Sequence, residues 1–153
     1  MANPKSGSWY TGDLAPAAGI VVDRATAALP QTATDILFTV TGTVLLKAII
    51  GLVTTEVGGV ANNTKLTHVA TDICSVLDVT GDVVGTRYSI DGTFANALIA
   101  TAIGVPVAKQ ATEVVLPAGN LILDCAGSDG GGGRVSWHLT YEPLSEGATV
   151  AAA

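Results

Sequence analysis

Residues 134–141 alternate apolar and polar side chains without a break. In an extended strand this alternation places large apolar side chains on one face and polar side chains on the other. The apolar face consists of Val135, Trp137, Leu139 and Tyr141, and the polar face of Ser136, His138 and Thr140. A strand with one apolar face must cover that face with a second layer of structure. We therefore expect a layered β fold.

Further short segments rich in Val, Ile, Leu and Thr follow one another from Asp35 onward, and Gly, Asn, Asp and Pro separate them. This spacing is typical of antiparallel strands joined by turns. The sequence therefore predicts an all-β fold, an antiparallel β-sandwich of the jelly-roll kind. The expected strands cover residues 35–41, 44–57, 65–70, 75–79, 86–90, 97–101, 113–116, 121–125 and 134–141.

The most apolar of these segments leaves two interpretations open. Leu46, Ile49, Ile50 and Val53 recur at a spacing that also suits a buried helix. Gly51 inside the segment and the β-branched residues that follow it favour a long strand covered on both faces. We expect the strand and keep the helix as the alternative.

The two ends of the chain lack the strand pattern. Residues 1–30 mix Pro, Gly, Ala and Ser, which predicts an extended N-terminal arm; a sandwich domain at 31–145 and a loose C-terminal tail at 146–153 are expected to follow. Free arms are normally polar, so large apolar side chains in this one predict contact with its own domain or with a neighbouring molecule. The candidate interface residues are Trp9, Tyr10, Ile20, Val21 and Val22.

Composition limits what can cover the surface of such a domain. Of the 153 residues, 48% are hydrophobic and only 13% are charged; an ordinary soluble domain is about 25% charged. Either a membrane or other protein surfaces must cover the excess apolar area. A spanning helix needs about 20 apolar residues, whereas Lys47 interrupts the most apolar run, and the first thirty residues predict no signal peptide. We therefore expect one domain that associates with copies of itself or with a partner.

The net charge argues against nucleic acid as that partner. It is −6, and the seven Lys and Arg residues are scattered singly along the chain. Contacts with phosphates need clustered basic side chains. We expect no direct binding of DNA or RNA.

The glycine run at 130–133 is the feature most similar to a phosphate-binding loop. Such a loop follows a strand and opens a helix, so that its backbone N–H groups face the anion. Here Asp129 precedes the run and the alternating strand follows it. We expect a flexible hairpin loop between the strand at 121–125 and the strand at 134–141.

The histidines and cysteines do not predict a metal or catalytic site. His68 and His138 lie within expected strands, with no acidic or cysteine residue at ligand spacing. We expect His138 at the surface or in an interface, because it lies on the face opposite Trp137. Cys74 and Cys125 are far apart in the sequence and are expected to be buried free thiols.

The remaining polar residues do not predict an enzyme either. Ser75, Ser89 and Ser136 lack the GxSxG turn of a nucleophilic serine. We expect no catalytic residue, no cofactor and no metal. Two alternatives stay open: a carbohydrate-binding module would need exposed aromatic side chains, and a hydrolase would need converging carboxylates or a Ser–His contact. Aspartates at turn positions are expected to cap those turns, namely Asp72, Asp78, Asp82 and Asp91.

Three stretches of the chain carry a recurring set of scaffold elements. LPQTATDILFTVTGTVLLKAIIGLVTTEV contains a TVTG turn, and NNTKLTHVATDICSVLDVTGDVVGTRYSIDGTF contains the segment LDVTGDVVGT. VLPAGNLILDCAGSDGGGGRVSWHLTYEPLSEGATV contains an LPAG turn and closes with W-x-L-x-Y-x-P-L. With these elements the chain resembles a group of small structural proteins of tailed-bacteriophage virions.

The resemblance implies a non-enzymatic β-sandwich component of the virion. The function it implies first is that of a decoration or cement protein, which binds the major capsid protein on the outer lattice as a homo-oligomer, expected to be a trimer, and stabilises the shell. Such a protein is made in the cytoplasm of the bacterial host and ends on the capsid surface. The alternative is a head-fibre, spike or tail component that binds a host glycan.

Overall fold

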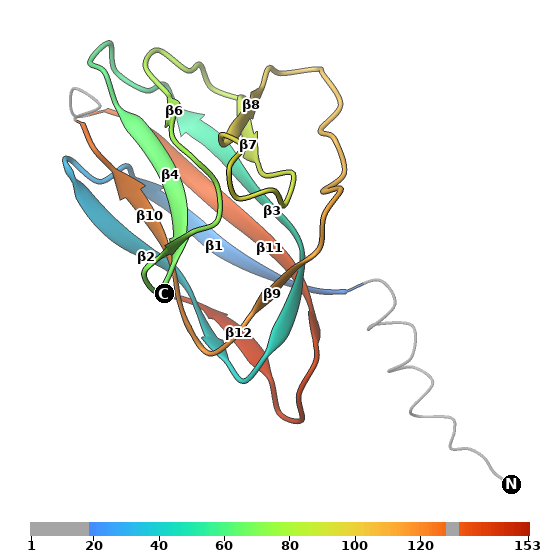
Figure 1. Cartoon of the computed structure of the whole chain (residues 1–153). Coiled ribbons are helices and arrows are strands. Elements are labelled where there is room, and N and C mark those ends of the chain that lie inside the picture. Colours follow the sequence, from blue (N-terminus) through green and yellow to red (C-terminus); the bar gives the residue numbers. More distant parts are fainter. Residues whose placement is uncertain (1–18, 128–131) are drawn as a thin grey trace, which may run out of the picture.

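The computed structural model of the chain describes residues 19–127 and 132–153 (Figure 1). Within that part the chain forms two antiparallel β-sheets and no helix. The two sheets pack face to face around one hydrophobic core. The fold is therefore all-β, as predicted, with the layers of a β-sandwich.

The first sheet consists of β1 (Ile20–Ala28), β3 (Val44–Thr55), β7 (Arg87–Ser89), β8 (Ile99–Thr101), β9 (Val114–Leu116) and β11 (Arg134–Pro143). Its order is β1-β11-β3-β7-β8, and β9 also pairs with β3. The second sheet consists of β2 (Ala33–Thr41), β4 (Asn63–His68), β5 (Thr71–Asp72), β6 (Leu77–Asp78), β10 (Gly119–Cys125) and β12 (Thr149–Ala152). Its order is β12-β2-β10-β4-β5, and β6 also pairs with β4.

The alternating segment at 134–141 forms the central part of the first sheet. It lies in β11, between β1 and β3. Its four apolar side chains are buried, each with at most 4% of its surface exposed, and they face the second sheet. The alternation thus predicted both the strand and its core face.

The helix-like spacing in the most apolar segment has a structural cause within a strand. The segment is β3, and its pairing with β11 shifts register where Thr140 pairs with Ala48 and Tyr141 with Leu46. Lys47 is the extra residue of this bulge, so Leu46 and Ile49 both point into the core, three positions apart. The strand interpretation is confirmed, and the apparent helical period reflects the bulge.

The partner predicted for the last strand is wrong. Residues 121–125 belong to β10, which pairs with β2 and β4 in the opposite sheet. The connection with the glycine run therefore passes from one sheet to the other and is not a hairpin loop; its residues 128–131 lie outside the described part. The described flanks are held by two backbone bonds, from Thr32 N to Gly127 O at 2.9 Å and from Leu29 N to Gly133 O at 3.0 Å.

Both ends of the sandwich contain strands that the sequence analysis missed. Ile20–Ala28 were expected to belong to an arm, but they form β1 and pair with β11. Thr149–Ala152 were expected to lie in a loose tail, but they form β12 and pair with β2. The expected arm is thus wrong for its second half, while residues 1–18 lie outside the described part of the chain.

Candidate interaction surface

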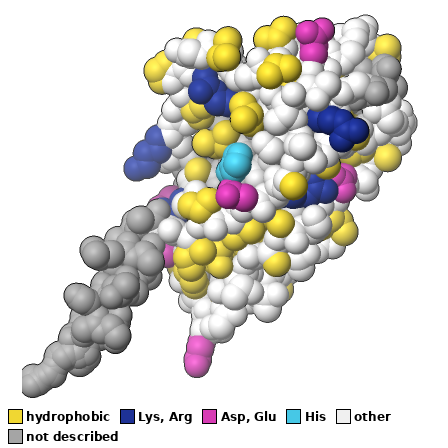
Figure 2. Space-filling view, turned by 180° about the vertical axis from the view of Figure 1, so that it is seen from behind, with side chains coloured by type: hydrophobic (Ala, Val, Ile, Leu, Met, Phe, Trp, Pro, Cys, Tyr) yellow, Lys and Arg dark blue, Asp and Glu magenta, His cyan; other side chains and the backbone are white. Residues whose placement is uncertain are grey.

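The outer face of the sheet formed by β1, β11 and β3 combines apolar and uncharged polar side chains. The alternation of each strand sends these side chains away from the core, and the registers place them side by side. Figure 2 views the molecule from behind Figure 1 and shows several groups of hydrophobic side chains, with charged side chains and a histidine among them. The outward residues are Val21 and Asp23 of β1, Ser136, His138 and Thr140 of β11, and Ala48, Ile50 and Leu52 of β3.

A hydrogen bond between two side chains crosses this face. His138 Nδ1 and Asp23 Oδ1 are 2.7 Å apart on paired positions of β11 and β1. Their side chains are 45% and 68% exposed. The exposure expected for His138 is confirmed, and at this exposure the pair contributes little to the free energy of folding because water screens it.

The edge strand β1 presents part of the interface predicted from the sequence. Ile20 and Val21 are 37% and 60% exposed, and Val22 packs against the core. Within residues 19–127 and 132–153, β1 pairs with β11 alone, so its other edge has no strand partner there. Trp9 and Tyr10, the other two residues of the predicted interface, lie outside the described residues.

A second apolar group lies on two adjoining loops and was missed by the sequence analysis. Val83, Val84, Ile103 and Val105 are each about half exposed or more. The loops touch, because a Cβ on Gly85 would meet Ile103 Cδ1 at 2.8 Å, and Arg87 Nη2 donates to Val105 O. The available signal was the presence of consecutive valines and an isoleucine in glycine-containing turns, where polar residues are the rule.

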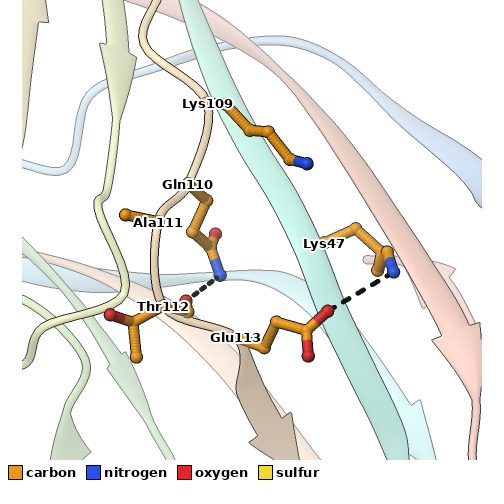
Figure 3. Close-up of a pocket in the computed structure, with 6 residues that line it drawn as sticks. All are labelled: Lys47, Lys109, Gln110, Ala111, Thr112 and Glu113. Carbon is orange, nitrogen blue, oxygen red and sulfur yellow. Dashed lines mark hydrogen bonds and ion pairs between the residues drawn. The ribbon is translucent and has the colours of Figure 1, made fainter.

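The segment between β8 and β9 borders two adjoining cavities. Figure 3 shows the larger, about 710 Å³, whose lining comes from β3 and from this segment: Lys47, Lys109, Gln110, Ala111, Thr112 and Glu113. The smaller, about 160 Å³, lies farther along β3 and is mainly apolar.

The cavities share Gln110, whose side chain is anchored. Gln110 Nε2 donates to Leu46 O at 3.1 Å and to Thr112 O at 2.9 Å. Across the larger cavity, Lys47 Nζ lies 3.2 Å from Glu142 Oε2 and 3.5 Å from Glu113 Oε1. The pKa of Lys47 is raised, first by the hydrogen bond that Lys47 donates to Glu142 and then by the negative charges of Glu142 and Glu113.

The turn aspartates do not converge on one site. Asp78 Oδ1 accepts from the hydroxyl of Thr80 and from its backbone N–H at 3.1 Å, and Asp91 Oδ1 accepts from the backbone N–H of Thr93 at 2.7 Å. Capping is thus confirmed for these two, and the hydrogen bonds they accept lower both of their pKa values. Asp82 accepts from the Tyr88 hydroxyl and Asp72 pairs with Lys65, so neither of these carboxylates caps its turn in this way.

The other candidate residues for chemistry are buried. Cys74 and Cys125 are free thiols, each 1% exposed, as expected. Burial raises the pKa of the Cys74 thiol to about 11, so the reactive thiolate is scarce at neutral pH. His68 ends β4, is 6% exposed, and burial lowers its pKa.

The described residues lack two further features that would point to a function. Among them, no group of three or more His, Cys, Asp or Glu side chains is placed to hold a metal ion. The described chain also has no helix that is long and apolar enough to cross a membrane.

No protein-family model matches the chain, and neither a curated protein nor a solved structure matches it. An account of function therefore depends on the surface and the sequence elements of this chain.

Proposed function

We propose that the chain is a non-enzymatic structural protein of a bacteriophage virion. It binds the major capsid protein on the outer lattice as a homo-oligomer, a trimer, and stabilises the shell as a decoration or cement protein. It is made in the cytoplasm of the bacterial host and acts on the capsid surface. The resemblance of its sequence elements to those of small virion proteins motivates the proposal, and the surface of the sandwich supports it.

The observation that carries the proposal is the amount of apolar surface that the folded domain leaves exposed. The exposed large apolar side chains are Ile20, Val21, Ile36, Val60, Val69, Val76, Val83, Val84, Phe94, Ile103, Val105, Val115 and Leu144. Single exposed apolar residues are ordinary, but adjoining ones on a surface with few charges mark contact with other proteins. One of the groups is continuous over neighbouring elements, namely the two adjoining loops with Val83, Val84, Ile103 and Val105, while Ile20 and Val21 lie together on the edge strand β1.

Repeated weak contacts suit a protein that coats a lattice. A stable interface buries about 800 Å² on each partner, and burial contributes about 25 cal/mol per Å² of apolar area before the costs of association. Each oligomer contacts several lattice subunits at once, so its contacts act together. The capsid as a whole is then stabilised by many copies of a modest interface.

The order of the strands supports the finer assignment to the jelly-roll class. The antiparallel pairs are nested along the chain: β1 with β11, β2 with β10, β3 with β9, and β4 with β5. A long hairpin rolled into two facing sheets produces this nesting. Jelly rolls are frequent in viral capsid proteins and lectins, but the class alone does not fix a function.

The proposal is tested on particles of the virus that encodes the chain. Cryo-electron microscopy of purified particles should show the sandwich as density on the outer capsid lattice, in symmetric clusters of copies. Removing the protein should lower the temperature at which the capsids release DNA, and adding it back should restore that temperature. Its absence from the capsid surface would refute this function.

A second function, that of a spike or tail component that binds a glycan, is favoured by the larger cavity. Its rim carries lysine, glutamate, glutamine and threonine side chains, which suit sugar hydroxyls and carboxylates. The five aromatic residues of the described chain do not line it. Saturable binding on a glycan array, lost in Lys109→Ala, would favour this alternative.

A further inference from the structure

The two cavities lie where the first sheet is interrupted beside β3. β9 pairs with residues 44–46 of β3 and β7 with residues 50–52, whereas neither strand pairs with residues 47–49. Residues 107–113 pass this interval without forming a strand, and Gln110 ties them to β3 through its hydrogen bond to Leu46 O. The interruption leaves a hollow with two compartments, the larger cavity and the smaller one, which we call the β3–β7 pocket.

The larger cavity has the volume and the polar groups of a site for a sugar. Its volume of about 710 Å³ lies within the range of ordinary small-molecule sites, about 300–1,000 Å³. Lys47, Thr112 and Glu113 line it and offer an ammonium group, a hydroxyl and a carboxylate. Sugar hydroxyls both donate and accept hydrogen bonds, so they can bond with all three.

Hydrogen bonds alone do not make this a strong site for a sugar. None of the aromatic side chains in the described part of the chain lines either cavity, so a bound sugar gains no contact with an aromatic ring. Its hydroxyl groups exchange bonds with water for bonds with the protein, at little net gain. Binding therefore depends on a charge–charge contact and on the burial of an apolar group.

Lys109 supplies a positive charge that the protein leaves unmatched. It lines both cavities and makes no ion pair or hydrogen bond within the described part of the chain. In Figure 3 its side chain extends across β3, whereas Lys47 is paired with Glu113. Lys47 is also paired with Glu142, at 3.2 Å. A carboxylate of a ligand can therefore pair with Lys109 without displacing a partner.

The β3–β7 pocket suits a compact apolar group. It measures about 160 Å³, whereas a cavity of roughly 150 Å³ in another protein admits benzene. The pocket is thus too small for a whole sugar and large enough for an acetyl group. Because Lys109 and Gln110 line both compartments, a substituent of a sugar in the larger cavity can enter the pocket. Its apolar lining consists of Ala48, Ile49, Ile50, Ile90 and Val107.

We propose that the hollow beside β3 binds an acidic N-acetylated sugar. The sugar ring lies in the larger cavity, its carboxylate pairs with Lys109, and the methyl group of its acetamido substituent enters the β3–β7 pocket. This inference rests on the glycan-binding alternative and names the class of sugar, and it applies whether or not the protein also coats capsids.

The first test is a titration of the full chain with four sugars, followed by the NMR shifts of its backbone amides. N-acetylmuramic acid carries both groups, N-acetylglucosamine only the acetamido group, glucuronic acid only the carboxylate, and glucose neither. We expect N-acetylmuramic acid to bind with a Kd of about 1 mM or lower. The sugars with one group should bind at least about threefold more weakly, and glucose weakest. Equal binding of all four sugars overturns the proposal.

A fifth sugar distinguishes two sources of the same chemistry. N-acetylneuraminic acid carries a carboxylate and an acetamido group on a different ring. Tighter binding of this sugar assigns the site to acidic surface glycans, and tighter binding of N-acetylmuramic acid assigns it to the bacterial cell wall. Saturable binding of neither sugar overturns the proposal.

The second test removes the charge. Lys109→Ala should reduce the affinity for N-acetylmuramic acid to that for N-acetylglucosamine, and leave the affinity for N-acetylglucosamine unchanged. The matched control is Lys65→Ala, which removes a lysine that pairs with Asp72 outside the cavities and should change neither affinity. Equal losses for both sugars in Lys109→Ala overturn the assigned contact with the carboxylate.

The third test fills the pocket. Ala48→Leu should weaken the binding of both N-acetylated sugars and leave that of glucuronic acid unchanged. Ala100→Leu is the control, because Ala100 is an exposed alanine of β8 that lines neither cavity. Unchanged binding of N-acetylglucosamine by a folded Ala48→Leu protein overturns the assigned role of the pocket.

The outcomes separate this inference from the proposed capsid function. A protein that coats capsids and binds none of these sugars refutes the sugar site alone. A protein that binds N-acetylmuramic acid as described and is absent from capsids refutes the decoration function alone.

Discussion

The six-membered ring of Trp137 lies directly on the α-carbon of Gly51, its partner on the neighbouring strand. A Cβ at Gly51 would meet Trp137 Cζ3 at 2.8 Å and Cη2 at 2.9 Å. Trp137 is 1% exposed and lies in the centre of the core, with Tyr88 6.3 Å away between ring centroids. A glycine inside a strand is usually unfavourable, but here it provides the space for the largest side chain of the core.

Gly51→Ala should therefore destabilise the domain. The added methyl group overlaps the ring and forces β3 and β11 apart, at a cost of about 1–3 kcal/mol. Gly59→Ala is the control, because a Cβ there meets nothing within 4 Å. Urea denaturation followed by tryptophan fluorescence measures the free energy of unfolding of both variants. Equal values would show that the core accommodates the added methyl group at Gly51 without cost.

Tyr88→Phe should lower the free energy of unfolding by about 1–3 kcal/mol, since the Tyr88 hydroxyl donates a 2.7 Å hydrogen bond to Asp82 Oδ2. Burial raises the pKa of Asp82, and the loss of the donor would leave this carboxylate less satisfied. Tyr141→Phe is the matched control, because that hydroxyl makes no hydrogen bond within the described part of the chain. Chemical denaturation at pH 7 compares them; a Tyr88→Phe protein as stable as Tyr141→Phe would contradict the assigned role.

The free energy of unfolding should fall as the pH drops below about 6.5. Burial lowers the pKa of His68, against a weaker opposing effect of its hydrogen bond to the Pro117 carbonyl. Below the ordinary histidine value of 6.5 the unfolded chain takes up a proton that the folded protein resists, so stability increases with pH through this range.

Denaturation midpoints at pH 5 and pH 7 check this dependence. His68→Gln should reduce the decrease in the free energy of unfolding between pH 7 and pH 5. His138→Gln, which replaces the exposed histidine, should not change that decrease. A fall of equal size in the His68→Gln protein would assign the effect to other groups.

Deletion of residues 1–18 should leave the sandwich folded, because β1 begins at Ile20. Deletion of residues 1–30 should lower the free energy of unfolding by at least about 3 kcal/mol, since it removes β1 with its partly buried Val22 and also the buried Leu29. It also removes the 2.7 Å ion pair between Arg24 and Asp35. Circular dichroism during heating distinguishes the two proteins; a full-stability protein lacking residues 1–30 would mean that β1 is dispensable.

The sequence predicted strands best where side chains alternate against the core. β11 and β10 were found for that reason. β1 and β12 were missed because Ile20–Ala28 and Thr149–Ala152 are rich in alanine and lie at sheet edges, where most of their residues are exposed. Local pattern carries little information at an edge strand.

The local sequence pattern did not predict which strands pair with each other. The segment at 134–141 pairs with β3, some ninety positions earlier, and not with its nearest neighbour in sequence. The same limit applies to the β3–β7 pocket, since Gln110, Ile50 and Ile90 come together only through the topology.

The central claim is that one copy of this sandwich does not cover its own apolar surface. Light scattering coupled to size-exclusion chromatography, on the full chain at micromolar concentration, tests that claim most directly. The account predicts a mass that is a small multiple of 15.3 kDa, three copies in the proposed trimer. A single species of 15.3 kDa that persists up to millimolar concentration would contradict it.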